Sequence, residues 1–131
     1  MITLTWCDGI RFEAEDRYGH KVIVDTEKEF GGSDQGFRPL ELILVSLAGC
    51  MGMDIVAILQ KKGGKIDNFV VEASGVRAEE HPHKYTKITL KFKCEGVYER
   101  EDLLRSFELS RDKYCSAVAT LSSSPELEFV I

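Results

Sequence analysis

The sequence contains few prolines, histidines and tryptophans, and its cysteines are far apart. Its 131 residues include three prolines, three histidines, one tryptophan and four cysteines. No repeat, linker or low-complexity tract interrupts the chain. The sequence contains no C-x-x-C pair, which would be typical of a zinc site. His81 and His83 lack a third ligand nearby, so we expect no metal. A secreted disulfide framework is not expected either, because a chain of this length can build an adequate core without disulfides.

Basic residues are also in deficit. Lysine and arginine number 17 against 22 acidic residues, which gives a formal charge of −5. This balance argues against nucleic acid or an anionic membrane as the main partner. Residues 1–5 are typical of a strand rather than a signal peptide, so we expect a cytoplasmic protein. With 44% hydrophobic and 30% charged residues, the chain is predicted to form one globular domain over residues 1–131.

The one long apolar segment predicts a central helix over residues 40–59. It follows Pro39, which suits the first turn of a helix, and it precedes Gly63 and Gly64, which favour its end. Apolar side chains occur on every side of this helix, so we expect it to be buried all round. Glu41 and Asp54 interrupt the run, so fewer than the ~20 continuous apolar residues of a membrane span are present.

The remaining segments predict mostly strands. An Asp8–Gly9 turn joins the first two strands, and a glycine-containing loop over residues 26–37 precedes the central helix. A second helix is expected over residues 99–113, with further helical turns over 116–121. Because strands follow one another in runs, the fold class is predicted as α+β with antiparallel sheets. The expected strands are residues 1–6, 10–14, 21–25, 68–76, 85–94 and 127–131.

Two of the four cysteines are candidates for chemistry. Cys50 lies in the middle of the central helix, and Cys115 follows the second helix directly. Backbone N–H groups at a new helix start, together with Lys113, would lower the pKa of the Cys115 thiol. Each cysteine has an equally simple interpretation as a buried packing residue. Cys7 and Cys94 are interpreted as structural, since one adjoins a turn and the other lies on the inward face of its strand.

The helix Pro39-x-Glu41-x8-Cys50, followed 65 residues later by Cys115, resembles the OsmC/Ohr family, and within it the YhfA-like branch. The order of strands and helices is similar too, so the resemblance covers essentially the whole chain. It implies an OsmC-like fold, in which antiparallel sheets wrap a long central helix in an intertwined homodimer.

The resemblance also implies a function, thiol-dependent reduction of organic hydroperoxides. Cys50 would be the peroxidatic cysteine, Cys115 would resolve its sulfenic acid to a disulfide, and an external dithiol would reduce that disulfide. Arg17 and Glu41 are similar to the family's supporting arginine and glutamate. No cofactor is implied.

Two alternatives remain at this point. The same fold would serve as a binding protein for a small apolar or thiol ligand, and Asp54, one turn after Cys50, favours this because a carboxylate raises a thiol pKa. The cysteines would otherwise serve only as packing.

Glu41 and Cys50 are nine residues apart, about 13.5 Å along a helix and about 180° around it. We therefore expect Glu41 to approach Cys50 from a second subunit.

Overall fold

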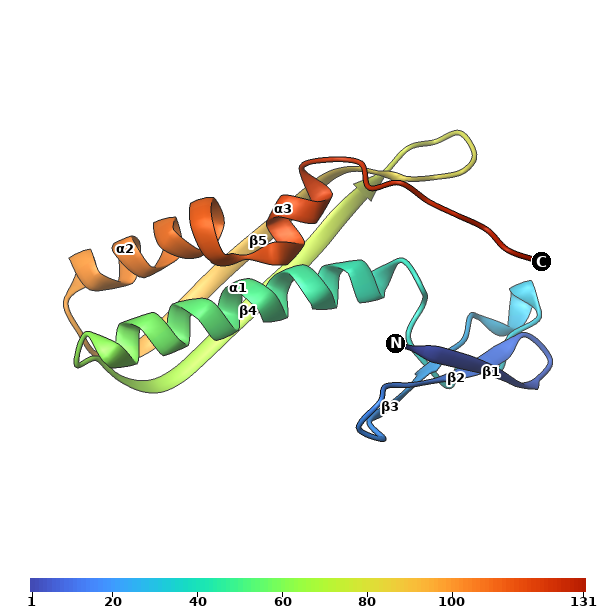
Figure 1. Cartoon of the computed structure of the whole chain (residues 1–131), viewed down its shortest axis with the longest axis horizontal. Helices are drawn as coiled ribbons and strands as arrows, with labels where there is room; N and C mark the ends of the chain where they lie inside the picture. The colour runs from blue at the N-terminus through green and yellow to red at the C-terminus, as the bar shows by residue number, and fades with distance from the viewer. The chain divides into compact units, whose positions relative to one another are not determined.

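The computed structural model describes residues 1–131, and these form two compact units, Met1–Ile43 and Leu44–Ile131. Figure 1 shows short strands in the first unit, and a long hairpin with accompanying helices in the second. The strands in both units pair antiparallel. The prediction of an α+β fold with antiparallel sheets and a central helix is therefore confirmed.

The N-terminal unit is a three-stranded antiparallel meander. Its strands β1 (Thr3–Asp8), β2 (Arg11–Glu15) and β3 (Lys21–Val24) lie in the order β1-β2-β3, as expected. Gly9 joins the first two strands with a φ of 51°, a left-handed conformation that glycine adopts without strain. A single 3₁₀ turn, η1 (Lys28–Phe30), lies in the loop that follows β3.

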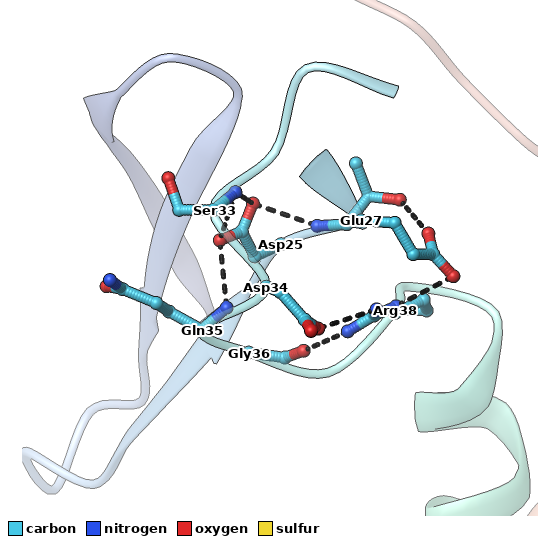
Figure 2. A network of polar contacts seen from close by, with 8 residues as sticks. Asp25, Glu27, Ser33, Asp34, Gln35, Gly36 and Arg38 are labelled. Carbon is cyan, nitrogen blue, oxygen red and sulfur yellow. Dashed lines mark hydrogen bonds and ion pairs between the residues drawn. The ribbon is translucent and has the colours of Figure 1, made fainter. Parts of the chain in front are cut away.

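Asp25 organises that loop from the end of β3. Its side chain is only 2% exposed, and its two oxygens accept hydrogen bonds from the backbone N–H groups of Thr26, Ser33 and Gln35 at 2.8 to 3.2 Å (Figure 2). Burial raises the pKa of Asp25, but these N–H groups and the charge of Arg11 outweigh it and hold the pKa below its ordinary value. The loop is therefore folded around a buried carboxylate.

The same loop binds the side chain of Arg38. Its guanidinium donates to Asp34 at 2.7 Å and to the carbonyl of Gly36 at 3.1 Å, and it pairs with Glu27 at 3.4 Å (Figure 2). Backbone approach is close at Gly32, where a Cβ atom would lie 2.0 Å from the carbonyl oxygen of Thr26. The loop expected over residues 26–37 thus has one defined arrangement.

The C-terminal unit is built on the antiparallel pair β4 (Lys65–Arg77) and β5 (Tyr85–Val97), which extend further than predicted. The central helix α1 (Glu41–Lys61) leads into this unit, and Gly63 follows its end with a left-handed φ of 89°, as expected. The predicted second helix is α2 (Arg100–Leu109), continued by a π-helical turn η2 (Ser110–Tyr114), and α3 (Ser116–Leu121) follows.

Side chains from these elements form one apolar core. Met51 and Ile55 of α1 are 3% and 1% exposed and pack with Cys115, inside a shell of partly buried apolar residues. Leu90 and Phe92 belong to that shell, as the alternation along β5 predicts. Phe107 of α2 meets Phe92 edge-on at 5.6 Å between ring centroids. The shell comprises Cys50, Phe69, Leu90, Phe92, Leu103, Phe107, Ala117 and Val118.

The expectation that α1 is buried all round is wrong for the single chain. Only Leu47, Met51, Ile55 and Leu59 are buried, a stripe with a spacing of four residues. Met53 remains 76% exposed, because one hairpin and two short helices cover only one side of the helix. By length and composition α1 could cross a membrane, but the core helix of a globular fold passes the same test.

The strand predicted over residues 127–131 is not formed. These residues belong to no element, and Leu127, Phe129 and Val130 are 72%, 85% and 88% exposed. A strand exists only through hydrogen bonds to a neighbour, and no strand of this chain pairs with the segment. Composition shows that residues 127–131 are apolar, but it does not show which strand would pair with them.

Candidate thiol site on α1, η2 and α3

The site begins with Cys50 on α1. Its side chain is half-buried, beside the fully packed Met51, and Asp54 follows one helical turn later. The sulfur atoms of Cys50 and Cys115 and a carboxylate oxygen of Asp54 all lie within 4.8 Å of one another. Two thiols that are 65 positions apart in the sequence are thus neighbours in the C-terminal unit.

The π-helical turn after α2 positions Cys115. The backbone N–H of Cys115 donates to the carbonyl of Ser110, five residues earlier, at 2.8 Å. This wider turn ends the helix and leaves Cys115 with an extended backbone at the N-cap of α3. The Cys115 sulfur accepts the backbone N–H of Val118 at 3.4 Å, and the residue is only 4% exposed. Cys115 is therefore both a helix cap and part of the core.

Neighbouring hydrogen-bond donors lower the pKa of the Cys50 thiol. The strongest is the backbone N–H of Ala117, and the side chains of Cys115 and Ser116 add to it; the Ser116 hydroxyl lies 3.9 Å from the sulfur. Partial burial and the charge of Asp54 act in the opposite direction. The expectation that Asp54 opposes ionisation holds, but the donors outweigh it. Cys50 is the thiol that ionises more readily.

The pKa of Cys115 is raised, which contradicts the expectation from its place at a helix start. Burial is the main cause, and the neighbouring Cys50 sulfur adds to it, against the backbone N–H groups of Val118 and Ala117. Lys113 does not offset this, since its ammonium lies over the ring of Tyr114 at 5.3 Å. The core around Cys115 could not be read from the residues next to it in sequence.

Asp54 is held by a residue that sequence reasoning missed. The Ser110 hydroxyl, which is fully buried, donates to Asp54 Oδ2 at 2.9 Å. Ser116, whose hydroxyl lies 3.9 Å from the Cys50 sulfur, was not a predicted site residue either. A sequence signal for Ser110 did exist: it follows Phe107 by three residues and so continues the inward face of the helix. A buried hydroxyl on such a face requires a partner, and that partner is Asp54.

Arg17 and Glu41 belong to the N-terminal unit. Arg17 is exposed, donates to the hydroxyl of Tyr18 and lies over its ring at 4.7 Å, with no carboxylate paired to it. The other two arginines of this unit are paired, Arg11 with Asp8 at 3.0 Å and Arg38 as described above. Glu41 is exposed at the first turn of α1. The supporting roles of Arg17 and Glu41 remain predictions.

Comparison with known sequences and structures places this chain in a family. The family profile described as OsmC-like protein matches residues 32–130. The chain belongs to the OsmC-like family. Protein YhfA of Escherichia coli is 31% identical over 120 residues, which cover 91% of this chain and 87% of YhfA. The resemblance to the YhfA-like branch is thereby confirmed.

Solved structures agree with the OsmC-like fold. A hypothetical protein from Aquifex aeolicus is 30% identical, with a TM-score of 0.81 over 95% of this chain and 87% of its own. An organic hydroperoxide resistance protein from Elizabethkingia anophelis is 17% identical, with a TM-score of 0.64 over 91% of this chain and 85% of its own. At that identity the second likeness shows the fold alone.

Proposed function

We propose that this OsmC-like chain is a thiol-dependent peroxidase that reduces organic hydroperoxides. One observation carries the proposal: two thiols within 4.8 Å have pKa values displaced in opposite directions, Cys50 downward and Cys115 upward. Pairs of titratable groups whose environments separate their pKa values divide the roles of a reaction between them. Cys50 supplies the nucleophile, and Cys115 remains a protonated thiol until it is needed.

The chemistry follows from that division. The Cys50 thiolate attacks the distal oxygen of the hydroperoxide, the O–O bond breaks, and the alkoxide takes a proton to leave as an alcohol. Cys50 is now a sulfenic acid. The Cys115 sulfur attacks it, an S–S bond forms and water leaves. An external dithiol then exchanges with this disulfide, returns both cysteines to thiols and is itself oxidised.

The surroundings of Cys50 favour organic over inorganic peroxides. The sulfur lies on the apolar helix α1, half-buried against the core cluster that contains Met51 and Ile55. Alkyl or aryl groups therefore have apolar surface beside the reacting sulfur. Arg17 and Glu41 are proposed to support the thiolate, since a desolvated anion requires a positive partner and a defined orientation.

We also propose that the working protein is a homodimer. Val45, Gly49 and Met53 form an exposed stripe along α1, with Val45 50% and Met53 76% exposed. Residues 127–131 add a second exposed apolar segment without a pairing strand. Wrapping of these surfaces by a second copy would bury more than the ~2,000 Å² of ordinary interfaces. Sedimentation that detects a folded monomer at micromolar concentration would contradict this.

Thiol counting tests the peroxidase. Reduced protein is mixed with one equivalent of cumene hydroperoxide, and free thiols and cumyl alcohol are then quantified. We expect two thiols lost and one alcohol formed per chain. Cys50→Ser should abolish both, whereas Cys94→Ser, which removes a half-buried cysteine outside the site, should preserve them.

The second candidate is a binding protein for a small apolar or thiol ligand. The Asp54 carboxylate favours it, because its charge acts against the Cys50 thiolate. The same experiment separates the two functions. Full retention of thiols in the presence of excess cumene hydroperoxide would exclude the peroxidase and leave the binding protein.

A further inference from the structure

Three metal-binding side chains converge at the thiol site. Cys50 and Asp54 come from successive turns of α1, and Cys115 comes from the N-cap of α3. Their sulfur and oxygen atoms lie within 4.8 Å of one another. No sequence motif indicates this set, because the chain contains no C-x-x-C pair and Cys115 is 61 positions after Asp54.

The spacing suits a tetrahedral ion. With Zn–S bonds of about 2.3 Å and Zn–O bonds of about 2.0 Å, ligand atoms of a tetrahedral zinc site are about 3.5–3.8 Å apart. The three atoms here need to approach one another by at most ~1 Å, which rotation of side chains about χ1 supplies. The donor set selects the metal as well, since two thiolates with one carboxylate fit zinc better than magnesium or calcium.

The residues around the three ligands also orient and shield them, as residues around metal sites commonly do. The buried Ser110 hydroxyl donates to Asp54 Oδ2 at 2.9 Å, which fixes the orientation of the carboxylate. Met51 and Ile55, both nearly inaccessible, restrict solvent on the α1 side. Cys50 is half-buried, which leaves an entry path for an ion.

We propose that the reduced chain binds one zinc ion through Cys50, Asp54 and Cys115, with a water molecule at the fourth position. Binding releases the two thiol protons to solvent, and the three anionic ligands with Zn²⁺ carry a net charge of −1. When diamide takes two electrons from the pair, an S–S bond joins Cys50 and Cys115, no thiolate remains, and Zn²⁺ returns to solvent. The site stands on its own geometry. One consequence alone, that bound zinc blocks Cys50 as the nucleophile, rests on the proposed function.

Cobalt substitution tests the site without any activity measurement. The Cys7→Ser, Cys94→Ser double variant retains only the two site cysteines, and it is reduced and titrated with Co²⁺ under anaerobic conditions. We expect one equivalent to bind with thiolate-to-cobalt charge-transfer absorption and the intense visible bands of a tetrahedral ion. Excess Zn²⁺ should bleach the spectrum and protect both cysteines from alkylation.

Four further variants in this background test the three ligands and the supporting hydroxyl of Ser110. Cys50→Ser and Cys115→Ser should each reduce the charge-transfer absorption and weaken binding strongly. Asp54→Asn, which keeps the side-chain shape, should weaken Zn²⁺ binding by about tenfold or more, and Ser110→Ala by about tenfold through loss of carboxylate orientation. Each variant's circular dichroism serves as the folding control.

The proposal is overturned if reduced protein shows no charge-transfer absorption, or if Cys50→Ser leaves the spectrum unchanged. It is also overturned if Asp54→Asn binds Zn²⁺ as tightly as the parent. Failure of the peroxidase leaves all these readouts intact, because none involves a hydroperoxide. The diamide-oxidised double variant, in which the two thiols are joined, should bind neither metal.

Discussion

The two units of the chain use their buried polar groups differently. In the N-terminal unit, Asp25 is enclosed by backbone N–H groups of its own loop, so its charge is fully satisfied and serves to hold the loop. In the C-terminal unit, side-chain atoms of Cys50, Cys115 and Asp54 lie within 4.8 Å of one another, and the two thiols shift each other's pKa. A buried group whose hydrogen bonds are all local is structural, whereas groups that perturb one another remain available for chemistry.

The largest expected effect breaks the C-terminal cluster. Cys115→Ser should lower steady-state reduction of cumene hydroperoxide about 100-fold with a dithiol reductant, because the Cys50 sulfenic acid loses its internal partner. The first turnover should proceed near the parent rate, since Cys50 remains and a serine hydroxyl at position 115 still donates to its sulfur. Stopped-flow measurement of cumyl alcohol, with dimedone labelling of the sulfenic acid, checks both statements.

A serine at position 115 also tests which thiol attacks. If Cys115→Ser eliminated the first turnover as well, Cys115 rather than Cys50 would be the nucleophile, and the assignment from the opposed pKa directions would be wrong. Cys7→Ser is the matched control, since Cys7 is exposed on β1 and should change neither phase.

Much of this cluster could be predicted from the sequence, and the reasons are local. Pro39 and Gly63 delimit the central helix through their own backbone preferences, a fixed φ for proline and a positive φ for glycine. Both ends of the helix were therefore predicted closely. Cys50 and Cys115 were identified by their spacing in a family pattern.

The rest depended on contacts between distant segments. Burial in the core, not the adjacent helix start, sets the direction of the Cys115 pKa. The hydrogen bond from Ser110 to Asp54 joins side chains 56 positions apart, and no local pattern encodes it. Residues 127–131 have the composition of a strand, but a strand also requires a neighbour.

The second expected effect tests the proposed role of Arg17. Arg17 has no carboxylate paired to it, so its charge is available to a thiolate. Arg17→Ala should raise the pKa of Cys50 and slow its reaction with hydroperoxide about tenfold, the equivalent of one pKa unit. Iodoacetamide alkylation rates as a function of pH measure this. In the parent, the midpoint should lie below the ~8.5 of a free thiol.

Arg17→Lys is the control for that experiment, since it preserves the charge and should recover most of the reactivity. Arg11→Ala removes an arginine that is already paired with Asp8, and should leave the alkylation profile unchanged. An unchanged profile in Arg17→Ala would make Arg17 a surface residue without a role at the thiol.

A smaller effect concerns the exposed stripe of α1. Gly49 lies between Val45 and Met53, and a Cβ there would meet no atom of its own chain within 4 Å. In an isolated chain Gly49→Ala would therefore stabilise the helix by about 1 kcal/mol. We propose that a second copy covers this stripe, so the added Cβ should clash with the partner. We therefore expect Gly49→Ala to weaken the dimer by about tenfold in Kd. Analytical ultracentrifugation measures the dissociation constant.

Gly52→Ala provides the matched helix control, because its added Cβ would make only an ordinary contact, 3.6 Å from Val71, within the same chain. Its dimer affinity should remain that of the parent. A more stable, equally associated Gly49→Ala variant would show that the stripe is not an interface.

The smallest expected effect belongs to Asp25. Because its folded pKa is depressed, its stabilising contribution is complete at pH values above the ordinary Asp pKa of about 3.9, and is lost as pH falls through the lower folded value. Asp25→Asn places an amide donor against the N–H groups of the loop. It should lower the melting temperature at pH 7 by about 3 °C. It should also remove the part of the acid-induced loss of stability that protonation of Asp25 causes.

Hydrogen exchange locates that loss. Amides of Ser33 and Gln35, which donate to Asp25, should exchange faster in Asp25→Asn, whereas amides of β4 and β5 and the alkylation rate of Cys50 should remain unchanged. Asp34→Asn, which alters an exposed carboxylate of the same loop, should have less effect than Asp25→Asn. Slower alkylation of Cys50 in Asp25→Asn would contradict the comparison, because the buried charge of the N-terminal unit would then serve the thiol as well as its own loop.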